Sequence, residues 1–396
     1  INLSGLTLDL DDIAGATING LINADTITGT NGADIIDGGA GADTIDGGGG
    51  NDVFVYASLG AFISGGTVVD NITGGTGTDT VRITDTGAIT IAAGNLATRI
   101  GTVETLAVVA ANTGGISITL NETDRANSGL NTIDLSGDSS TTGANTVDLS
   151  AVTGGAFTVT GSSGADTITG TTGADTVNAG DGDDTVNTGG GNDTLNLGAG
   201  ANMVTITDGH DISGASITTS GGGTYGLTVN GNATMTGAQH SGATGITAAG
   251  GSDQITFSGT VTGLTGAAAV ETYVLANGTN SFTLGAAGQN VTGGTGADTV
   301  STGAFDATGA LSLGGGANVV SIADGRSIAG ATISATGTYS LTVNGNATMT
   351  GGQHSGANSI TASGGSDQIT FSGVVTGVTG AAAVETYVLA NGTNSF

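Results

Sequence analysis

The sequence predicts an all-β protein built as a parallel β-solenoid, and three observations carry this prediction. Aspartate recurs every nine residues through 20–55 and again through 161–205, with glycine around each copy. Proline is absent and β-branched Thr, Val and Ile abound, which favours strands joined by tight turns over a disordered glycine-rich chain. The stretches 225–282 and 339–396 agree at 51 of 58 positions. Internal repeats on these scales are typical of solenoids.

The composition excludes several classes of partner and site. The 396 residues include 33 acidic residues, four arginines and no lysine, for a formal net charge of −29. So few basic groups cannot neutralise phosphates, so neither nucleic acid nor an anionic membrane surface is expected as a partner. Membrane insertion is not expected either, since no apolar run approaches a membrane span. The absence of cysteine excludes disulfides and thiolate metal sites. Because the sequence opens on Ile1, we interpret it as a fragment or a processed chain.

The first block reads GLINADTIT, GTNGADIID, GGAGADTID and GGGGNDVFV over residues 20–55. Six glycine-rich residues can turn the chain sharply, and three more make a short strand whose middle side chain points inward. Two such units would complete a coil of about eighteen residues, with neighbouring strands about 4.8 Å apart. The aspartate at the sixth place of each unit should then stack along the coil edges, Asp25 over Asp43 and Asp34 over Asp52.

The second block repeats this pattern over residues 161–205, and isolated copies stand at 74–82 and 293–301. In the second block, Asp166 should lie over Asp184 and Asp175 over Asp193. Asparagine replaces the sixth-place aspartate at Asn202 and Asn318, so those coils are expected to cap a ladder or to bind metal poorly. No convincing helix is expected, although a segment such as GAAAVETYV could form one helical turn between strand-like neighbours.

Longer repeats suggest four segments, namely 1–60, 61–156, 157–282 and 283–396. A Val-Glu-Thr sequence follows a glycine-aspartate turn at 103–105, 270–272 and 384–386. The repeat of about 114 residues continues past Phe282 in its first copy, so the parent protein is expected to run on beyond Phe396.

Stacked carboxylates call for a cation. At about 5 Å and an effective dielectric constant near 20, each pair of like charges costs roughly 3 kcal/mol. A divalent ion would turn this repulsion into attraction, and hard oxygen donors without His or Cys favour Ca²⁺ over zinc, copper or Mg²⁺. Catalysis is not expected, because the aspartates are many, alike and, by this interpretation, exposed on turns, whereas carboxylate catalysis needs two differently tuned groups in a cleft.

The units GGAGADTID and GGGGNDVFV resemble the RTX nonapeptide, a repeat of secreted bacterial proteins. The resemblance implies a calcium-binding β-roll, in which sixth-place carboxylates and turn carbonyls from coils two repeats apart share each ion. The implied carboxylate ligands are Asp25, Asp34, Asp43, Asp52, Asp79, Asp166, Asp175, Asp184, Asp193 and Asp298. The implied carbonyl ligands are those of Gly38, Ala40, Gly47, Gly49, Gly170, Thr172, Thr188 and Gly190.

The remaining Gly/Thr/Ala-rich sequence resembles the body of bacterial S-layer proteins and large RTX surface proteins. We therefore expect a non-enzymatic, calcium-stabilised structural protein, exported by type I secretion to the bacterial surface or matrix. It would assemble with copies of itself into an S-layer or fibre, with a cell-surface polysaccharide as a candidate partner. Two alternatives stay open: the spacer region of a large adhesin, and the calcium-binding module of a secreted enzyme.

The remaining polar and aromatic side chains are interpreted as structural. The three histidines, His210, His240 and His354, are expected to be surface or packing residues rather than metal ligands. Tyr273, Tyr387, Phe282 and Phe396 are expected to fill the core.

Overall fold

The computed structural model describes residues 15–363 and 365–396. The chain divides into two compact units: one holds the residues up to Thr205 with Gly214–Gly226, and the other holds Ile206–Ser213 with Leu227–Phe396. Each unit is a parallel β-solenoid, as predicted. Among the pairings of the described strands, only the short β6–β7 hairpin is antiparallel.

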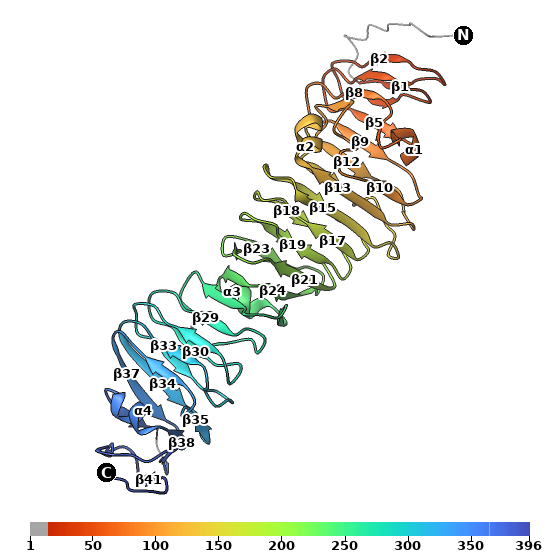
Figure 1. Ribbon diagram of the computed structural model, residues 1–396. Coiled ribbons are helices and arrows are strands. Elements are labelled where there is room, and N and C mark those ends of the chain that lie inside the picture. The colour runs from red at the N-terminus through yellow and green to blue at the C-terminus, as the bar shows by residue number, and fades with distance from the viewer. Residues whose placement is uncertain (1–14, 364) are drawn as a thin grey trace. The chain divides into compact units, whose positions relative to one another are not determined.

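In the first unit the chain winds through three parallel sheets made of the described strands (Figure 1). The first sheet contains, in spatial order, β1 (Thr17–Asn19), β3 (Ile35–Asp37), β5 (Val53–Tyr56), β9 (Thr80–Ile83), β12 (Thr105–Val108), β14 (Thr132–Asp134), β16 (Thr158–Thr160), β18 (Thr176–Asn178), β20 (Thr194–Asn196) and β23 (Ser216–Thr218). The second contains β10 (Ile89–Ile91), β13 (Ile116–Asn121), β15 (Asn145–Ala151), β17 (Asp166–Thr169), β19 (Thr185–Asn187) and β21 (Ala201–Ile206). The third contains β11 (Ile100–Gly101), β8 (Asn71–Thr73), β4 (Thr44–Asp46) and β2 (Thr26–Thr28), and the hairpin is β6 (Ile63–Ser64) with β7 (Thr67–Val68).

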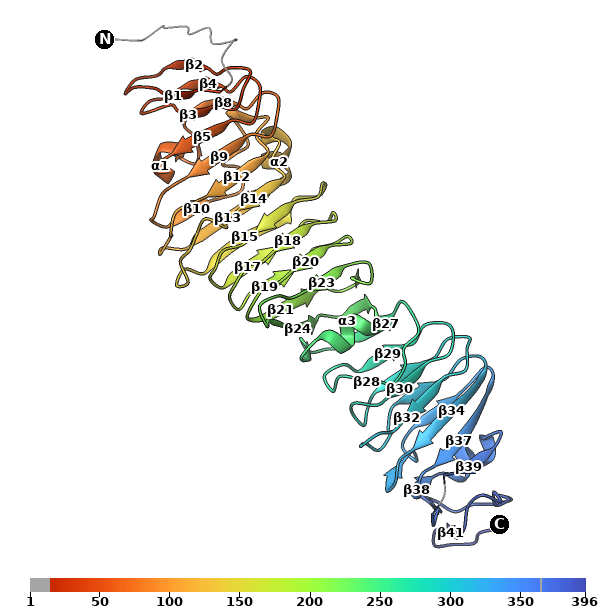
Figure 2. The ribbon, with the colours of Figure 1, turned by 180° about the vertical axis from the view of Figure 1, so that it is seen from behind.

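The second unit also winds through parallel sheets (Figure 2). One contains β22 (His210–Asp211), β25 (Asn232–Met235), β27 (Gln254–Phe257), β29 (Thr272–Val274), β31 (Asn290–Thr292), β33 (Ala310–Ser312) and β36 (Thr332–Ser334). Another contains β28 (Leu264–Thr265), β30 (Ser281–Thr283), β32 (Thr299–Ser301), β34 (Ala317–Ile322), β37 (Thr338–Val343) and β39 (Ile360–Ala362). A third contains β35 (Arg326–Ser327), β38 (Asn346–Met349), β40 (Gln368–Phe371) and β41 (Thr386–Val388), while β24 (Thr224–Val229) pairs with β26 (Ile246–Ala248).

The expectation of no helix is wrong. The described residues form four short helices, α1 (Leu59–Phe62), α2 (Glu122–Ser128), α3 (Gly237–Gly242) and α4 (Gly351–Gly356). The sequence carried a signal for α3, because Thr236 and Gln239 form a capping box in which side chains and backbone N–H groups bond reciprocally. None of the helices in the described part of the chain is both long and apolar enough to cross a membrane.

The core is a stack of the inward-facing residues at the middle of each short strand. Val177 pairs with Leu195 in a register of eighteen residues, and both are at most 1% exposed. Tyr273 and Phe282 are buried in the core, as expected, but Phe396 is 53% exposed. That expectation is therefore wrong for Phe396.

The division into four segments, 1–60, 61–156, 157–282 and 283–396, describes sequence repeats and stays a prediction.

Candidate metal centre

The sixth-place carboxylates form ladders along the coil edges, and each rung is joined to the next by one hydrogen bond. The backbone N–H of Asp25 donates to Oδ1 of Asp43 over 2.8 Å, and the N–H of Asp43 donates to Oδ1 of Asp70 over 2.9 Å. The expected stacking of Asp25 and Asp43 is thus present. The third rung, Asp70, lies 27 residues further on, because α1 and the β6–β7 hairpin lengthen the intervening coil.

A parallel ladder runs through Asp34, Asp52, Asp79 and Glu104. Each backbone N–H donates to the carboxylate of the following rung, over 2.8, 2.8 and 2.7 Å. A glutamate can therefore occupy a rung. This gives the Val-Glu-Thr sequence a structural meaning, since its glutamate stands where a sixth-place aspartate would.

The same bond organises the rest of the chain. In the first unit it joins Asp166 to Asp184, Asp184 to Asn202, and Asp175 to Asp193, each over 2.9 Å. In the second unit it joins Asn280 to Asp298, Asp298 to Asn318, Asp253 to Glu271 and Asp367 to Glu385, over 2.8–3.2 Å. Because one oxygen accepts the ladder bond at every rung, aspartate, asparagine and glutamate are interchangeable for this purpose alone.

The interpretation of these aspartates as exposed on turns is wrong. Asp52 and Asp79 are fully buried, and Asp43, Asp184 and Asp193 are 1% exposed. The ladder bond is the physical reason, because a side chain that accepts an N–H from the coil behind it must lie between coils rather than in solvent.

Oδ2, the carboxylate oxygen that does not accept the ladder bond, indicates where an ion can bind. Within the described part of the chain, eight ladder aspartates keep a buried Oδ2 that has no hydrogen-bond partner: Asp43, Asp52, Asp79, Asp184, Asp193, Asp253, Asp298 and Asp367. Burying a charged oxygen without a partner is costly. These atoms are therefore poised to bind a cation or a proton.

The residue at the second place of a turn helps to decide whether Oδ2 is free. Before Asp34 this residue is Thr30, whose backbone N–H donates to Asp34 Oδ2 over 2.6 Å. Leu21, Ser162 and Thr171 make the same bond in their turns. Before Asp43 the second place is Gly39, whose φ is +86° and whose N–H donates instead to Asp37 Oδ1. The left-handed backbone directs this N–H away from Oδ2 of Asp43.

Burial raises the pKa of several aspartates in the two blocks above the ordinary value of 3.8. It raises the pKa of Asp184 and of Asp193 to about 7, and that of Asp52 to about 6. The pKa values of Asp43 and Asp79 are raised for the same reason. In the metal-free turns, burial therefore destabilises the ionised form of these carboxyls at neutral pH.

The turn carbonyls lie beside these carboxylates, between successive coils. A Cβ built on Gly170 would lie 2.8 Å from the oxygen of Thr188, so the Thr188 carbonyl points at the coil before it. The first-place carbonyls of Gly38 and Gly47 point in the same way at Gly20 and Gly29. Close approach of this kind needs glycine. The ligand roles of the eight carbonyls stay a prediction.

The donor set fits calcium. No group of three or more His, Cys, Asp or Glu side chains among the described residues could hold a metal. An ion at these turns would therefore be bound by one or two carboxylates together with backbone carbonyls. Such an all-oxygen set suits Ca²⁺, whose coordination is flexible, and provides nothing for softer metals.

At some rungs, the side-chain atom that does not accept the ladder bond has a hydrogen-bond partner within the protein. Asp70 Oδ2 accepts a bond of 2.7 Å from the Tyr56 hydroxyl. Asn280 uses its amide nitrogen, which donates to the carbonyls of Ala276 and Gly278 over 2.8 and 3.2 Å. These rungs end or interrupt the series of free Oδ2 atoms.

The histidines of the long repeat pack in the core, as expected. His240 Nε2 lies 3.3 Å from the hydroxyl of Tyr273, and His354 Nε2 lies 3.2 Å from that of Tyr387. Burial lowers the pKa of His240 to about 4, so the ring is neutral at physiological pH. His210 lies in β22, with Nδ1 2.9 Å from the Thr207 hydroxyl.

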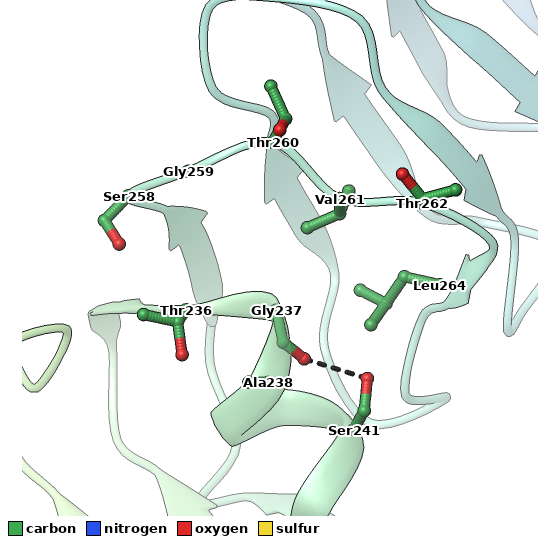
Figure 3. A pocket seen from close by; sticks show the side chains of 10 residues that line it. All are labelled: Thr236, Gly237, Ala238, Ser241, Ser258, Gly259, Thr260, Val261, Thr262 and Leu264. Carbon is green, nitrogen blue, oxygen red and sulfur yellow. Dashed lines mark hydrogen bonds between the residues drawn. The ribbon is translucent and has the colours of Figure 1, made fainter. Parts of the chain in front are cut away.

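Each copy of the long repeat also carries an open pocket beside its short helix. The pocket at α3 has a volume of about 450 Å³ and is lined by hydroxyl and apolar groups such as Thr236, Ser258 and Leu264, with Ser241 Oγ donating to the carbonyl of Gly237 (Figure 3). No residue that lines it is charged, so it offers no charged catalytic or metal-binding group.

Sequence reasoning did not count several rungs among the metal ligands, namely Asp70, Glu104, Asp253, Glu271, Asn280, Asp367, Glu385 and Asn394, although the segments at Asp253 and Asp367 are weak relatives of the nonapeptide. The available signal is an acid or amide followed by a strand triplet with an apolar middle residue, as in Asp70–Thr73 (DNIT) and Glu271–Val274 (ETYV). The nine-residue spacing hid it, because the turns before these rungs differ in length.

Comparison with known families supports the same assignment. The model of the RTX calcium-binding nonapeptide repeat, in four copies, matches residues 19–54 and 160–195. No curated protein and no solved structure matches the chain. The matched segments coincide with the two blocks of stacked aspartates, and repeats of this family bind calcium ions at their turns. Calcium is thus the ion for the turns of these blocks.

Proposed function

We propose that this chain, a calcium-binding structural repeat protein, is a surface or matrix component that folds outside the bacterial cell and assembles into an S-layer or fibre. One observation carries the calcium dependence: buried ladder carboxylates keep an unpartnered Oδ2 and have raised pKa values. Without an ion these groups oppose folding, and with one they favour it, so binding energy contributes directly to folding energy.

Export by type I secretion is part of the proposal. The matched repeats are typical of proteins secreted in this way. A net charge of −29 with unfilled ladders would keep much of the chain unfolded at the low calcium concentration inside a cell. Calcium outside the cell would then drive folding where the protein is used.

Calcium dependence is tested first by circular dichroism of the full chain. In EGTA the β-sheet signal should fall, and calcium should restore it at concentrations at which Mg²⁺ does not. A spectrum that is unchanged by EGTA, after the loss of bound calcium has been verified, would remove the calcium-dependent part of the proposal.

Assembly is tested separately by electron microscopy and sedimentation velocity with and without calcium. Lattices or filaments that appear only with calcium are the expected result. Isolated particles at every concentration would contradict self-assembly.

The duplication supports one alternative function, the spacer of a large adhesin. Two stretches identical at 51 of 58 positions suit a spacer, whose copies need only keep their length and stability. Isolated calcium-bound particles in the microscope would favour this alternative over the S-layer.

A further inference from the structure

Each copy of the long repeat contains an Asp–Glu pair that lies outside the matched nonapeptide segments. The backbone N–H of Asp253 donates to Oε2 of Glu271 over 2.8 Å, and Asp367 makes the same bond to Glu385 over 2.8 Å. Both aspartates are 1% exposed. The two carboxyls of each pair therefore stand one above the other on one edge of the coil.

The aspartate of each pair has one oxygen engaged and one free. Oδ1 of Asp253 accepts the backbone N–H of Gly231 over 2.6 Å, and Oδ1 of Asp367 accepts that of Gly345 over 2.7 Å. Oδ2 is buried in both, with no hydrogen-bond partner among the described residues. The same arrangement recurs in the first unit, where Asp79 has a free Oδ2 and its N–H donates to Glu104.

No basic side chain in the described structure neutralises these pairs. The one salt bridge found there joins Arg125 to Glu122 in the first unit. The nearest imidazoles by sequence, His240 and His354, are engaged with tyrosine hydroxyls. A buried carboxylate oxygen that has no partner, one coil away from an exposed glutamate carboxylate, is stabilised by binding a cation or a proton.

We propose that Asp253 with Glu271, and Asp367 with Glu385, each hold one hard divalent cation, for which calcium is the probe. The inference rests on the proposed calcium dependence and extends it to turns that the nonapeptide pattern does not cover. Here Gly250 and Gly251 have positive φ and provide a turn with a different glycine spacing from the nonapeptide.

The test counts bound ions. After equilibrium dialysis against calcium, the full chain with Asp253→Asn and Asp367→Asn should hold two fewer calcium ions than wild type, measured by elemental analysis. Asparagine keeps the Oδ1 acceptor and removes the charge, so the fold should survive. A matched control is Asp208→Asn with Asp324→Asn, exposed residues before the two copies that accept backbone bonds from Asn232 and Asn346 and should leave the count unchanged.

The outcomes separate this inference from the proposed function. An unchanged count in the Asp253/Asp367 variant, with calcium bound to wild type, overturns the inference alone. No calcium on wild type overturns both. The double variant Glu271→Gln with Glu385→Gln provides a second readout. Glutamine keeps the acceptor for the ladder bond, and the calcium affinity of the same two sites should fall at least tenfold.

A different contact carries a second inference, at the turns 276–280 and 390–394. The amide nitrogen of Asn280 donates to the carbonyls of Ala276 and Gly278 and to Oδ1 of Asp298, and that of Asn394 donates to the carbonyls of Ala390 and Gly392 over 2.7 and 3.2 Å. Carbonyls only accept, so the group facing them must be the NH₂. The amide therefore supplies the positive end that turn carbonyls otherwise receive from a metal.

We infer that Asn280 and Asn394 are built-in substitutes for a cation and make their turns independent of calcium. Oδ1 of each still accepts its ladder bond, from Val261 and Val375. Each long repeat would then pair one cation turn with one amide turn, so that part of the coil stays ordered when calcium is scarce.

Asn280→Asp tests this by exchanging NH₂ for O⁻ without changing size. The variant should bind one more calcium ion than wild type and melt at a lower temperature in EGTA. Asn277→Asp, an exposed residue of the same turn, is the control and should change neither quantity. A wild-type ion count in Asn280→Asp overturns the inference. Asn394→Asp repeats the test in the second copy, should the first variant fail to fold.

Discussion

The backbone N–H of Asp34 donates to Oδ1 of Asp52 over 2.8 Å, although eighteen residues separate them. Oδ2 of Asp52 is buried and has no partner within the described residues. One oxygen of this carboxylate thus holds two coils together, while the other is left for an ion. Loss of the side chain and loss of its charge should therefore have different consequences.

Asp52→Ala and Asp52→Asn separate these two roles. Alanine leaves the N–H of Asp34 buried without an acceptor and should cost about 1–3 kcal/mol of unfolding free energy, with or without calcium. Asparagine keeps the acceptor, so its melting temperature in EGTA should match or exceed that of wild type, while the gain from calcium shrinks. Thermal melts by circular dichroism measure both. Equal losses in the two variants would contradict the division of roles.

Metal-free stability should fall as the pH rises. Burial raises the pKa of Asp184 and Asp193 to about 7 in the folded chain, against an ordinary 3.8. Between these values the folded state binds protons that the unfolded state has released, so the free energy of unfolding decreases with pH. In EGTA the melting temperature should be higher at about pH 5 than at about pH 7.5, and Asp184→Asn with Asp193→Asn should flatten this difference. A melting temperature that rises with pH in EGTA would refute the assignment.

Calcium affinity should depend on the residue at the second place of the turn. Gly39→Thr introduces a side chain at a φ of +86°, which costs about 1–3 kcal/mol in backbone strain. Its Cβ would also clash with the carbonyl oxygen of Leu21, so the turn has to shift. When the turn adjusts, the backbone N–H of residue 39 can donate to Oδ2 of Asp43, as the N–H of Thr30 donates to Oδ2 of Asp34. Both effects should weaken calcium binding at this turn, measured by isothermal titration. Gly60→Ala, with open space around it, is the control and should leave the affinity unchanged.

Core substitutions should act locally. Leu195 is fully buried between Val177 and Ile217 of the neighbouring strands. Leu195→Ala should cost about 2–5 kcal/mol. Each coil contacts only its neighbours, so hydrogen exchange should quicken around β18, β20 and β23 and stay unchanged near β3. Ile35→Ala, at a position 42% exposed, should change stability by less than about 0.5 kcal/mol.

Much of the fold follows from the nine-residue period. Within the two nonapeptide blocks, the apolar eighth place, as at Ile168 and Val177, marks the inward side chain of each short strand, and the sixth-place aspartates fix the coil edges. Where the period holds, the eighteen-residue stacking of Asp175 on Asp193 follows from it. Where inserted helices and hairpins change the coil length, as between Asp43 and Asp70, spacing alone could not identify the next rung.

The burial of the carboxylates could not be predicted from the nine-residue period. Composition placed them among glycines and hence on turns, which are ordinarily exposed. Only the contact between coils shows that each one accepts a backbone N–H and is enclosed, and that enclosure raises the pKa of Asp52.

By itself, the sequence determined that this protein is a parallel β-solenoid with calcium-binding turns, because periodic glycine, aspartate and aliphatic residues have few other ways to pack. Only the tertiary structure decided which carboxylate oxygens are free and where an amide replaces the ion. The physical reason is that these choices depend on backbone direction across coils: the N–H of Thr30 donates to Oδ2 of Asp34, whereas the N–H of Gly39, at positive φ, donates to Asp37 and leaves Oδ2 of Asp43 free.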